Sequence, residues 1–116
     1  MKRVAIPIID GRMCEYFEKC SYCEIFEIDR DSVKSIETEV LPSDIAQLPE
    51  WANQQGITDI IAYKIDKKII SLFTEEKINL FVGINSDTSV RLIEAYVNGT
   101  LKSDEKIILE ITSENE

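Results

Sequence analysis

The segment that decides the fold is residues 3–28, RVAIPIIDGRMCEYFEKCSYCEIFEI. Residues 4–9 form a short continuous apolar run, which is typical of a central strand covered on both faces. Asp10-Gly11 predicts a turn after this run, and a polar loop follows. Residues 22–28 then alternate in polarity and are rich in β-formers, so they predict a second strand.

The rest of the chain first continues this strand pattern and then changes to a helical one. Residues 33–41 alternate again after a turn at 29–32, which predicts a hairpin with one solvated face. From residue 48 onward, the pattern predicts helices that alternate with short buried strands. The expected helices cover residues 48–56, with Pro49 in the first turn and Gly56 after the end, about 66–77 with Asp66 as cap, and a stretch from Ser86 or Asp87 to Gly99; the expected strands cover 57–63 and 79–84.

The expected element order is therefore β-β-β-α-β-α-β-α in a single domain. Strands that alternate with helices imply parallel pairing through right-handed crossovers. In the last helix, Val90, Ile93 and Val97 are expected to share the apolar face. After Leu101 the chain becomes charged, but residues 106–111, KIILEI, contain a short apolar run. This run predicts either an extra edge strand or a segment that docks on a partner, and both alternatives stay open.

Composition excludes several classes of partner. The chain has 116 residues, of which 44% are hydrophobic, so it can bury a core. Its net charge is −9, which argues against a nucleic-acid or anionic membrane partner, because both are bound through clustered Lys and Arg. No apolar run approaches the ~20 residues that a membrane span needs. The first residues also lack the apolar core of a signal peptide, so we expect a cytoplasmic protein.

The chain has three cysteines and no histidine. The missing histidine excludes a Ser-His-Asp triad and every His-containing zinc site. Cys20-Ser-Tyr-Cys23 is a C-x-x-C motif, and with Cys14 it offers three thiolates, which are soft ligands for iron–sulfur or copper. The alternative is that Cys23 is a core residue and the other two are incidental, since free cysteine is often buried.

Several segments, taken in their order and spacing, match one known family. They are VAIP at residues 4–7, the Asp10-Gly11 turn, EYFEK at 15–19, QGITDIIA at 55–62, LFVG at 80–83 and EAYVNGTL at 94–101. With these segments, the chain resembles the dinitrogenase iron-molybdenum cofactor biosynthesis family, the small domain of NifX- and NafY-type proteins. The resemblance covers about residues 2–101.

The resemblance implies a ribonuclease-H-like three-layer α/β fold, with a mixed five-stranded sheet between helices and no nuclease activity. It implies a domain over residues 1–101, followed by a charged tail over 102–116. Members of the family are associated with binding or carrying iron–sulfur or molybdenum-containing clusters. The chain departs from the family at two places. Tyr16-Phe17-Glu18 stands where the family usually has His-Phe-Gly, and residues 63–68 replace a glycine-rich turn.

The resemblance also implies where a ligand would bind. Ligands of open α/β sheets lie outside the carboxyl ends of the parallel strands, where the loops 10–21, 63–68 and 84–88 would share one edge. The expected ligand-binding residues in these loops are Arg12, Lys19, Lys64, Lys67, Ser86 and Thr88, with Lys68 and Asn85 beside them. Helix N-termini near Asp66 and Asp87 would add N–H donors for an anion. The alternative reading of the lysines is a solvated start of a helix.

Two hypotheses of different classes follow. The first is a non-enzymatic binding or carrier protein for a metal–sulfur cluster or another anionic small ligand; the cofactor is then an iron–sulfur or molybdenum-containing cluster, or none. The second is a protein–protein interaction or regulatory module that has lost cofactor binding and uses the hairpin edge or residues 107–109. An enzyme is the weakest reading, because nothing in the sequence supplies a base for a catalytic cysteine. Oligomeric state is not predicted.

Overall fold

The computed structural model describes residues 1–107. Six strands and three α-helices make up most of this part of the chain. The strands are β1 (Lys2–Ile9), β2 (Arg12–Met13), β3 (Tyr22–Asp29), β4 (Ser32–Val40), β5 (Asp59–Ile61) and β6 (Asn79–Phe81). The helices are α1 (Leu48–Gln55), α2 (Lys67–Glu75) and α3 (Ser89–Asn98), with short 3-10 turns η1 (Phe17–Lys19) and η2 (Ile45–Gln47).

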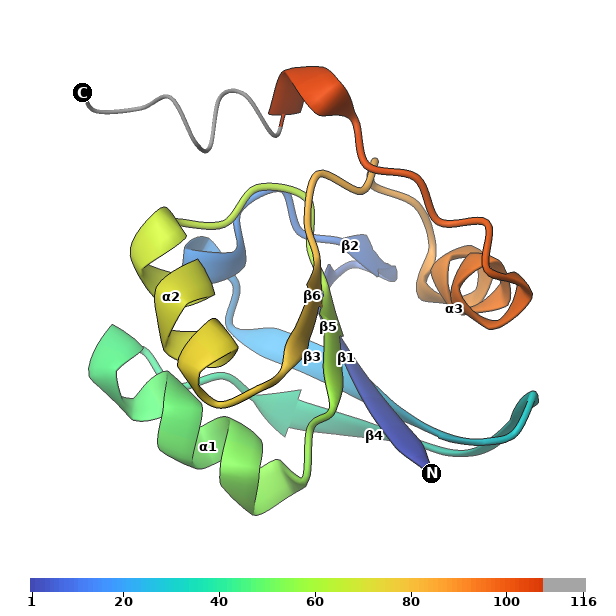
Figure 1. Cartoon of the computed structure of the whole chain (residues 1–116), viewed down its shortest axis with the longest axis horizontal. Helices are drawn as coiled ribbons and strands as arrows, with labels where there is room; N and C mark the ends of the chain where they lie inside the picture. Colours follow the sequence, from blue (N-terminus) through green and yellow to red (C-terminus); the bar gives the residue numbers. More distant parts are fainter. Residues whose placement is uncertain (108–116) are drawn as a thin grey trace.

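The strands form one mixed sheet in the order β4-β3-β1-β5-β6, and the short β2 pairs with β1. β1, β3 and β4 are antiparallel neighbours, whereas β1, β5 and β6 are parallel neighbours. Helices α1 and α2 cover one face of the sheet and α3 covers the other (Figure 1). The predicted mixed α/β class and the parallel pairing of the later strands are confirmed. β2 was not predicted.

Each face of the sheet carries its own hydrophobic core. Ile25, Ile60 and Phe73 belong to the core under α1 and α2, which also contains Trp51. Phe26 and Ile93 belong to the core under α3. Along β1, Ala5 enters the first core while Val4 and Ile6 enter the second, because successive side chains of a strand point to opposite faces. β1 is thus the central strand that its continuous apolar run predicted.

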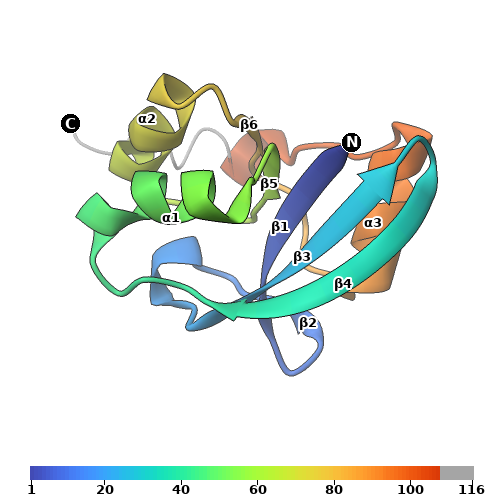
Figure 2. The ribbon, with the colours of Figure 1, turned by 90° about the horizontal axis from the view of Figure 1, so that it is seen from below.

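The predicted turn at Asp10-Gly11 and the predicted hairpin of the second and third long strands are confirmed. Asp10 and Gly11, both with positive φ (53° and 79°), form the two-residue turn between β1 and β2. This conformation matches the twist of two antiparallel strands. β3 and β4 form the long hairpin that crosses the front of Figure 2, and β4 is an edge of the sheet.

The first two predicted helices are also confirmed. α1 has proline in its first turn and ends at Gly56 in the left-handed conformation. α2 is capped by the Asp66 side chain, which accepts a hydrogen bond from the Lys68 N–H.

The prediction for the third helix was wrong in two respects. α3 begins at Ser89 rather than near Ser86 or Asp87, because the Thr88 side chain caps it by accepting a hydrogen bond from the Arg91 N–H. Val90 is 62% exposed, and Leu92 joins Ile93 in the core instead. Val90 lies in the first turn of α3, about 200° around the helix from the buried Leu92, so it faces solvent.

Only the first residues of the predicted tail are described. Asp104 N–H donates to the Gly83 carbonyl at 2.7 Å, and Ser103 forms an isolated bridge with Ile84. Residues 105–107 are helical, and Ile107 belongs to the core under α1 and α2. The predicted edge strand at 106–111 therefore lies mostly outside the described residues, and its two described residues are not extended. Within residues 1–107, no helix has the length and apolar character of a membrane span.

Candidate functional site

Three loops meet at the carboxyl ends of β1, β5 and β6. Phe17 N–H donates to the Lys64 carbonyl at 2.9 Å, and Lys64 N–H donates to the Glu15 carbonyl at 3.0 Å. On the other side, Met13 N–H donates to the Asp87 carbonyl at 3.0 Å. The structure thus brings residues 10–21, 63–68 and 84–88 to one edge of the sheet, which we call the loop edge.

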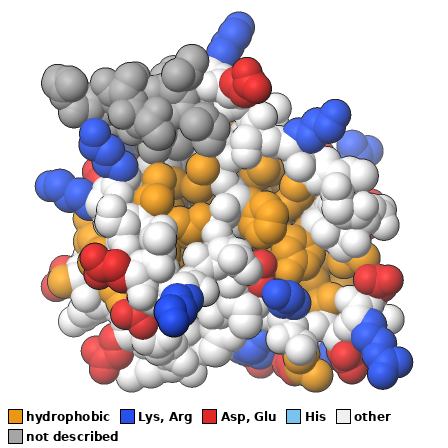
Figure 3. Space-filling view, viewed as in Figure 1, with side chains coloured by type: hydrophobic (Ala, Val, Ile, Leu, Met, Phe, Trp, Pro, Cys, Tyr) orange, Lys and Arg blue, Asp and Glu red, His pale blue; other side chains and the backbone are white. Residues whose placement is uncertain are grey.

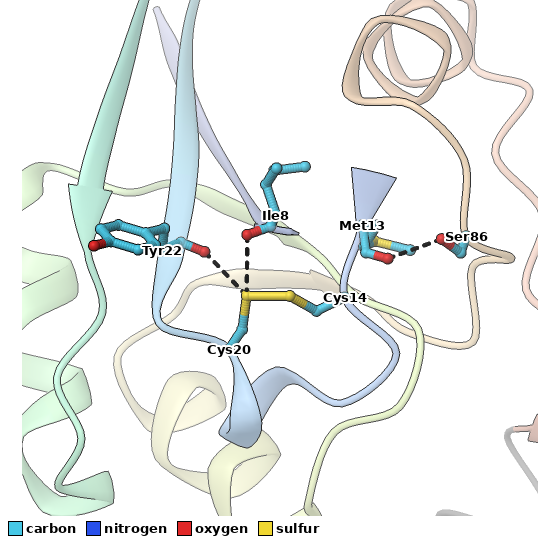
Figure 4. The surroundings of a disulfide bond; sticks show 6 residues. All are labelled: Ile8, Met13, Cys14, Cys20, Tyr22 and Ser86. Atoms are coloured by element: carbon cyan, nitrogen blue, oxygen red, sulfur yellow. Dashed lines mark hydrogen bonds between the residues drawn. A yellow bond between two sulfur atoms is a disulfide. The ribbon is translucent and has the colours of Figure 1, made fainter. Parts of the chain in front are cut away.

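Arg12, Ser86 and Thr88 lie together on the α3 side of the loop edge. Ser86 Oγ donates to the Met13 carbonyl at 2.8 Å (Figure 4), and Arg12 Nη2 donates to the Ser86 carbonyl at 3.3 Å. The backbone of Thr88 forms an isolated antiparallel β-bridge with Arg12, and the Thr88 side chain caps α3. The two hydroxyl groups therefore hold the loops in place. Arg12 remains exposed and can also meet a ligand.

Lys19 and Lys64 lie on the α2 side of the loop edge, against the Tyr16 ring. Their Nζ atoms are 5.0 Å and 5.2 Å from the ring centroid, within the range of a cation–π interaction. Lys64 Nζ is also 3.4 Å from Glu15 Oε2. Tyr16 was not predicted as a site residue. Its signal in the sequence was its position, since it stands where the resembled family usually has histidine.

The N-terminus of α2 differs from the expectation. Asp66 Oδ1 accepts a hydrogen bond from the Lys68 N–H at 2.7 Å, and Glu18 Oε1 accepts one from the Asp66 N–H at 3.2 Å. Two backbone N–H groups at the start of α2, which were expected to face a ligand, therefore donate to carboxylates of the protein itself. Lys67 and Lys68 are exposed at this helix start, as the alternative reading described.

The three cysteines do not form a common cluster in this structure. Cys14 and Cys20 form a disulfide (Figure 4). Cys23, in contrast, is a free thiol that is fully buried on β3. Burial, followed by the nearby charges of Glu39 and Glu24, raises the pKa of the Cys23 thiol to about 12. Among residues 1–107, no three His, Cys, Asp or Glu side chains converge as metal ligands. The three-thiolate site stays a prediction.

The sequence did not predict which cysteines pair. The C-x-x-C motif was interpreted as a source of metal ligands and no disulfide was predicted; Cys23 lies on the strand face that enters the core under α1 and α2. Cys14 N–H donates to the Pro7 carbonyl at 2.9 Å, and this bond returns the loop toward Cys20. Pairing thus depends on the course of the loop, which the spacing of the cysteines does not encode.

A cleft of about 530 Å³ opens beside the disulfide, between the loop and the end of β4. It is lined by Glu18, Lys19, Cys20, Ser21, Val40, Leu41, Pro42 and Ser43.

Apolar side chains are also present on other parts of the surface. Figure 3 shows hydrophobic side chains on both sides of the edge strand β6, where Leu80 and Val82 flank one core and Phe81 flanks the other.

Comparisons with known proteins agree with this fold. No family model matches the chain, and no curated protein matches it. The solved structure of PH0822 is 26% identical, covers 88% of this chain and 96% of its own, and has a TM-score of 0.80. The candidate dinitrogenase MJ0327 from Methanocaldococcus jannaschii is 25% identical, covers 88% and 93%, and has a TM-score of 0.70.

A third solved structure, the apo form of the orange protein from Desulfovibrio gigas, is 13% identical. It covers 90% of this chain and 93% of its own with a TM-score of 0.72, so it shows a shared fold alone. The family resemblance seen in the sequence therefore agrees with the fold of solved proteins, although their sequence identity to this chain is low. This chain has the fold of solved proteins that include a candidate dinitrogenase.

Proposed function

We propose that the protein is a non-enzymatic binding or carrier protein for a small anionic ligand of the metal–sulfur type, held at the loop edge. The observation that carries the proposal is the convergence of three loops at the carboxyl ends of β1, β5 and β6, with Arg12 on the α3 side and Lys19 and Lys64 on the α2 side, in a chain with a net charge of −9. The proposal includes a cytoplasmic location. It also includes the ribonuclease-H-like classification, which is supported by the strand order.

The chemistry of the loop edge suits an anion better than a bare metal ion. Lysine and arginine side chains carry only donors and positive charge, so they can pair with the sulfide or oxide surface of an anionic cluster. The Lys64 side chain is only 20% exposed, which weakens the screening of its charge by water. In contrast, the disulfide removes two of the three thiolates that a metal ion would require.

The first test loads the protein with two probes. The protein is purified anaerobically and incubated either with iron and sulfide or with tetrathiomolybdate, a molybdenum–sulfur dianion. After desalting, metal content and the absorption spectrum are measured. We expect retained metal in the wild type and a loss of retention in the double variant Lys19→Met/Lys64→Met. Lys34→Met, on the exposed edge strand β4, is the matched control and should retain the metal.

Variants of the cysteines separate the two modes of binding. If the cations hold the ligand, Cys14→Ser/Cys20→Ser retains the probe. Loss of the probe in this variant, with retention in Lys19→Met/Lys64→Met, would support thiolate ligation and overturn the assignment to the cations. A wild-type protein that retains neither probe would overturn the proposed function.

A second candidate function is a protein–protein interaction module, and the edge strand β4 favours it. Ile36 and Val40 on β4 are 56% and 64% exposed, and Tyr22 lies opposite Val40 on β3. An exposed edge with apolar side chains can pair with a strand of another chain. If two chains pair through this edge, light scattering should show an average mass that rises with protein concentration. The variant Ile36→Lys should show a lower mass than the wild type at the same concentration. A wild-type mass equal to that of the monomer at all concentrations would argue against self-association through this edge.

A further inference from the structure

The two residues of the Cys14–Cys20 disulfide differ in their exposure to solvent. Cys14 is 6% exposed, because its loop is bonded back to β1 through the Pro7 carbonyl. Cys20 is partly exposed and lines the cleft beside the end of β4. An incoming group therefore reaches the sulfur of Cys20 before that of Cys14.

The cleft gives this approach a suitable environment. Lys19 lies directly before Cys20 and lines the same cleft, so it adds a positive charge beside the exposed sulfur. A neighbouring cation favours the approach of a thiolate. Glu18 also lines the cleft, but its carboxylate accepts a hydrogen bond from the Asp66 N–H. The rest of the wall offers an apolar and hydroxyl surface on which a thiol compound can lie, made by Ser21, Val40, Leu41, Pro42 and Ser43.

We propose that the Cys14–Cys20 disulfide is a reversible thiol–disulfide exchange site, and that a thiolate of a dithiol reductant attacks Cys20 Sγ from the cleft. This proposal stands independently of the ligand proposed above. It rests on the placement of the two sulfurs and of the cleft. It also uses the cytoplasmic location proposed above, because disulfides in a reducing compartment, where they occur, are generally transient and catalytic or redox-sensing.

The exchange balances in two steps. In the first, the attacking thiolate forms a bond to Cys20 Sγ, the Cys14–Cys20 bond breaks, and Cys14 leaves as a thiolate that takes a proton from water. In the second, the other thiol of the reductant loses its proton and attacks the reductant sulfur of the mixed disulfide, which releases Cys20 as a thiolate. Two electrons have then passed from the dithiol to the protein, and the reductant is a disulfide.

The reduced Cys20 thiol has acceptors already in place. Its Sγ lies 3.3 Å from the Ile8 carbonyl oxygen and 3.2 Å from the Tyr22 carbonyl oxygen (Figure 4). Once Cys20 carries a proton, the thiol can donate a hydrogen bond to either oxygen. In the reduced protein, the Cys20 thiol therefore has a hydrogen-bond acceptor within reach.

The loop is anchored without the disulfide, so reduction does not require unfolding. Phe17, between the two cysteines, is buried and packs edge-on against Phe73 with ring centroids 5.9 Å apart. Its N–H is bonded to the Lys64 carbonyl. Cys23 is excluded from the exchange because its side chain has no exposed surface.

The test maps each cysteine under native conditions. Oxidised full-length protein is reduced with dithiothreitol at neutral pH, alkylated with excess iodoacetamide while it is still folded, and mapped by mass spectrometry. We expect labels on Cys14 and Cys20, and a label on Cys23 only after denaturation. In single variants exposed to glutathione disulfide, Cys20 in Cys14→Ser should form the mixed disulfide about tenfold faster than Cys14 in Cys20→Ser, because access controls the rate.

Three results would overturn the proposal. They are a disulfide that dithiothreitol reduces only in denaturant, a Cys14 that reacts as fast as Cys20, and a mixed disulfide on Cys23. If either single variant fails to fold by circular dichroism, acid trapping of the wild type during reduction by glutathione gives the same answer. Glutathione trapped on Cys20 supports the proposal, and glutathione trapped on Cys14 contradicts it.

Discussion

The two ends of the sheet use their polar residues in opposite ways. At the end away from the loop edge, Asp59 is 2% exposed, and its carboxylate accepts hydrogen bonds from Thr58 Oγ1 at 2.6 Å and from Asn79 Nδ2 at 3.4 Å. Asp59 also interacts with the Tyr96 hydroxyl group and adds to the effect of burial in raising the pKa of Tyr96. We call Thr58, Asp59, Asn79 and Tyr96 the closed end. Its polar groups satisfy one another, which is what burial demands.

Arg3 adds to the closed end by joining four elements. Its Nε donates to the Gln55 carbonyl at 2.6 Å, and its Nη atoms pair with Glu27 and Glu37 at 3.2 Å each. At the loop edge, in contrast, Arg12 is exposed and bonded to one backbone carbonyl. The difference indicates that one end serves stability and the other can serve binding.

The largest expected effect comes from removing the centre of the closed end. Asp59→Ala leaves the donors of Thr58, Asn79 and Tyr96 without their buried acceptor, so it should lower the free energy of unfolding by about 2–3 kcal/mol. Urea unfolding measures this value. Asp66→Ala, which removes an exposed helix cap, is the control and should cost about 1 kcal/mol. An equal or smaller cost for Asp59→Ala would contradict the comparison.

Opening the disulfide should cost somewhat less. Cys14→Ser/Cys20→Ser removes a cross-link that spans a sequence separation of 6, which constrains only a short loop of the unfolded chain. The expected loss is about 2 kcal/mol in urea unfolding. The wild type should lose the same amount in excess dithiothreitol. Unchanged stability in both experiments would mean that the disulfide does not stabilise the oxidised protein.

Alkaline pH should weaken the closed end. Burial, followed by the charge of Asp59 and a hydrogen bond to it, raises the pKa of Tyr96 from 10.0 to about 12. The unfolded chain therefore loses this proton at a lower pH than the folded chain, so stability falls as pH rises from 10 toward 12. Tyr96→Phe should lack this part of the fall. The exposed Tyr22→Phe is the control, and an identical pH dependence in all three proteins would contradict the assignment.

The smallest effect on stability is expected at the loop edge. Lys64→Met removes an ion pair with the 58% exposed Glu15 side chain, and such a pair contributes less than about 1 kcal/mol. Urea unfolding checks this expectation. A loss as large as that of Asp59→Ala would show that Lys64 serves the fold, and would weaken its assignment to ligand binding.

Local chemistry predicted much of this molecule. The Asp10-Gly11 turn, the Asp66 cap and Gly56 after α1 each depend on a few adjacent residues, and each was predicted. The convergence of the loops followed from the parallel arrangement of β1, β5 and β6. The exposed Val90 shows that an apolar residue in the first turn of a helix need not face the core.

What the sequence did not predict depends on contacts between distant segments. The Cys14–Cys20 pair requires the loop to return to Pro7, and the contact of the Tyr16 ring with Lys64 requires the loop to bond to the segment after β5. The carboxylates of Glu18 and Asp66 at the start of α2 likewise come from two segments. Spacing along the chain does not encode such meetings.

The most direct measurement of binding at the loop edge is a calorimetric titration with tetrathiomolybdate at low and high salt. The wild type should bind it saturably, and more weakly at high salt because the contact is electrostatic. Arg12→Met/Lys64→Met should bind about tenfold more weakly or worse, a change of about 1.4 kcal/mol, while Lys34→Met should match the wild type. Equal affinity in all three proteins, or no binding to the wild type, would contradict an anion site at the loop edge.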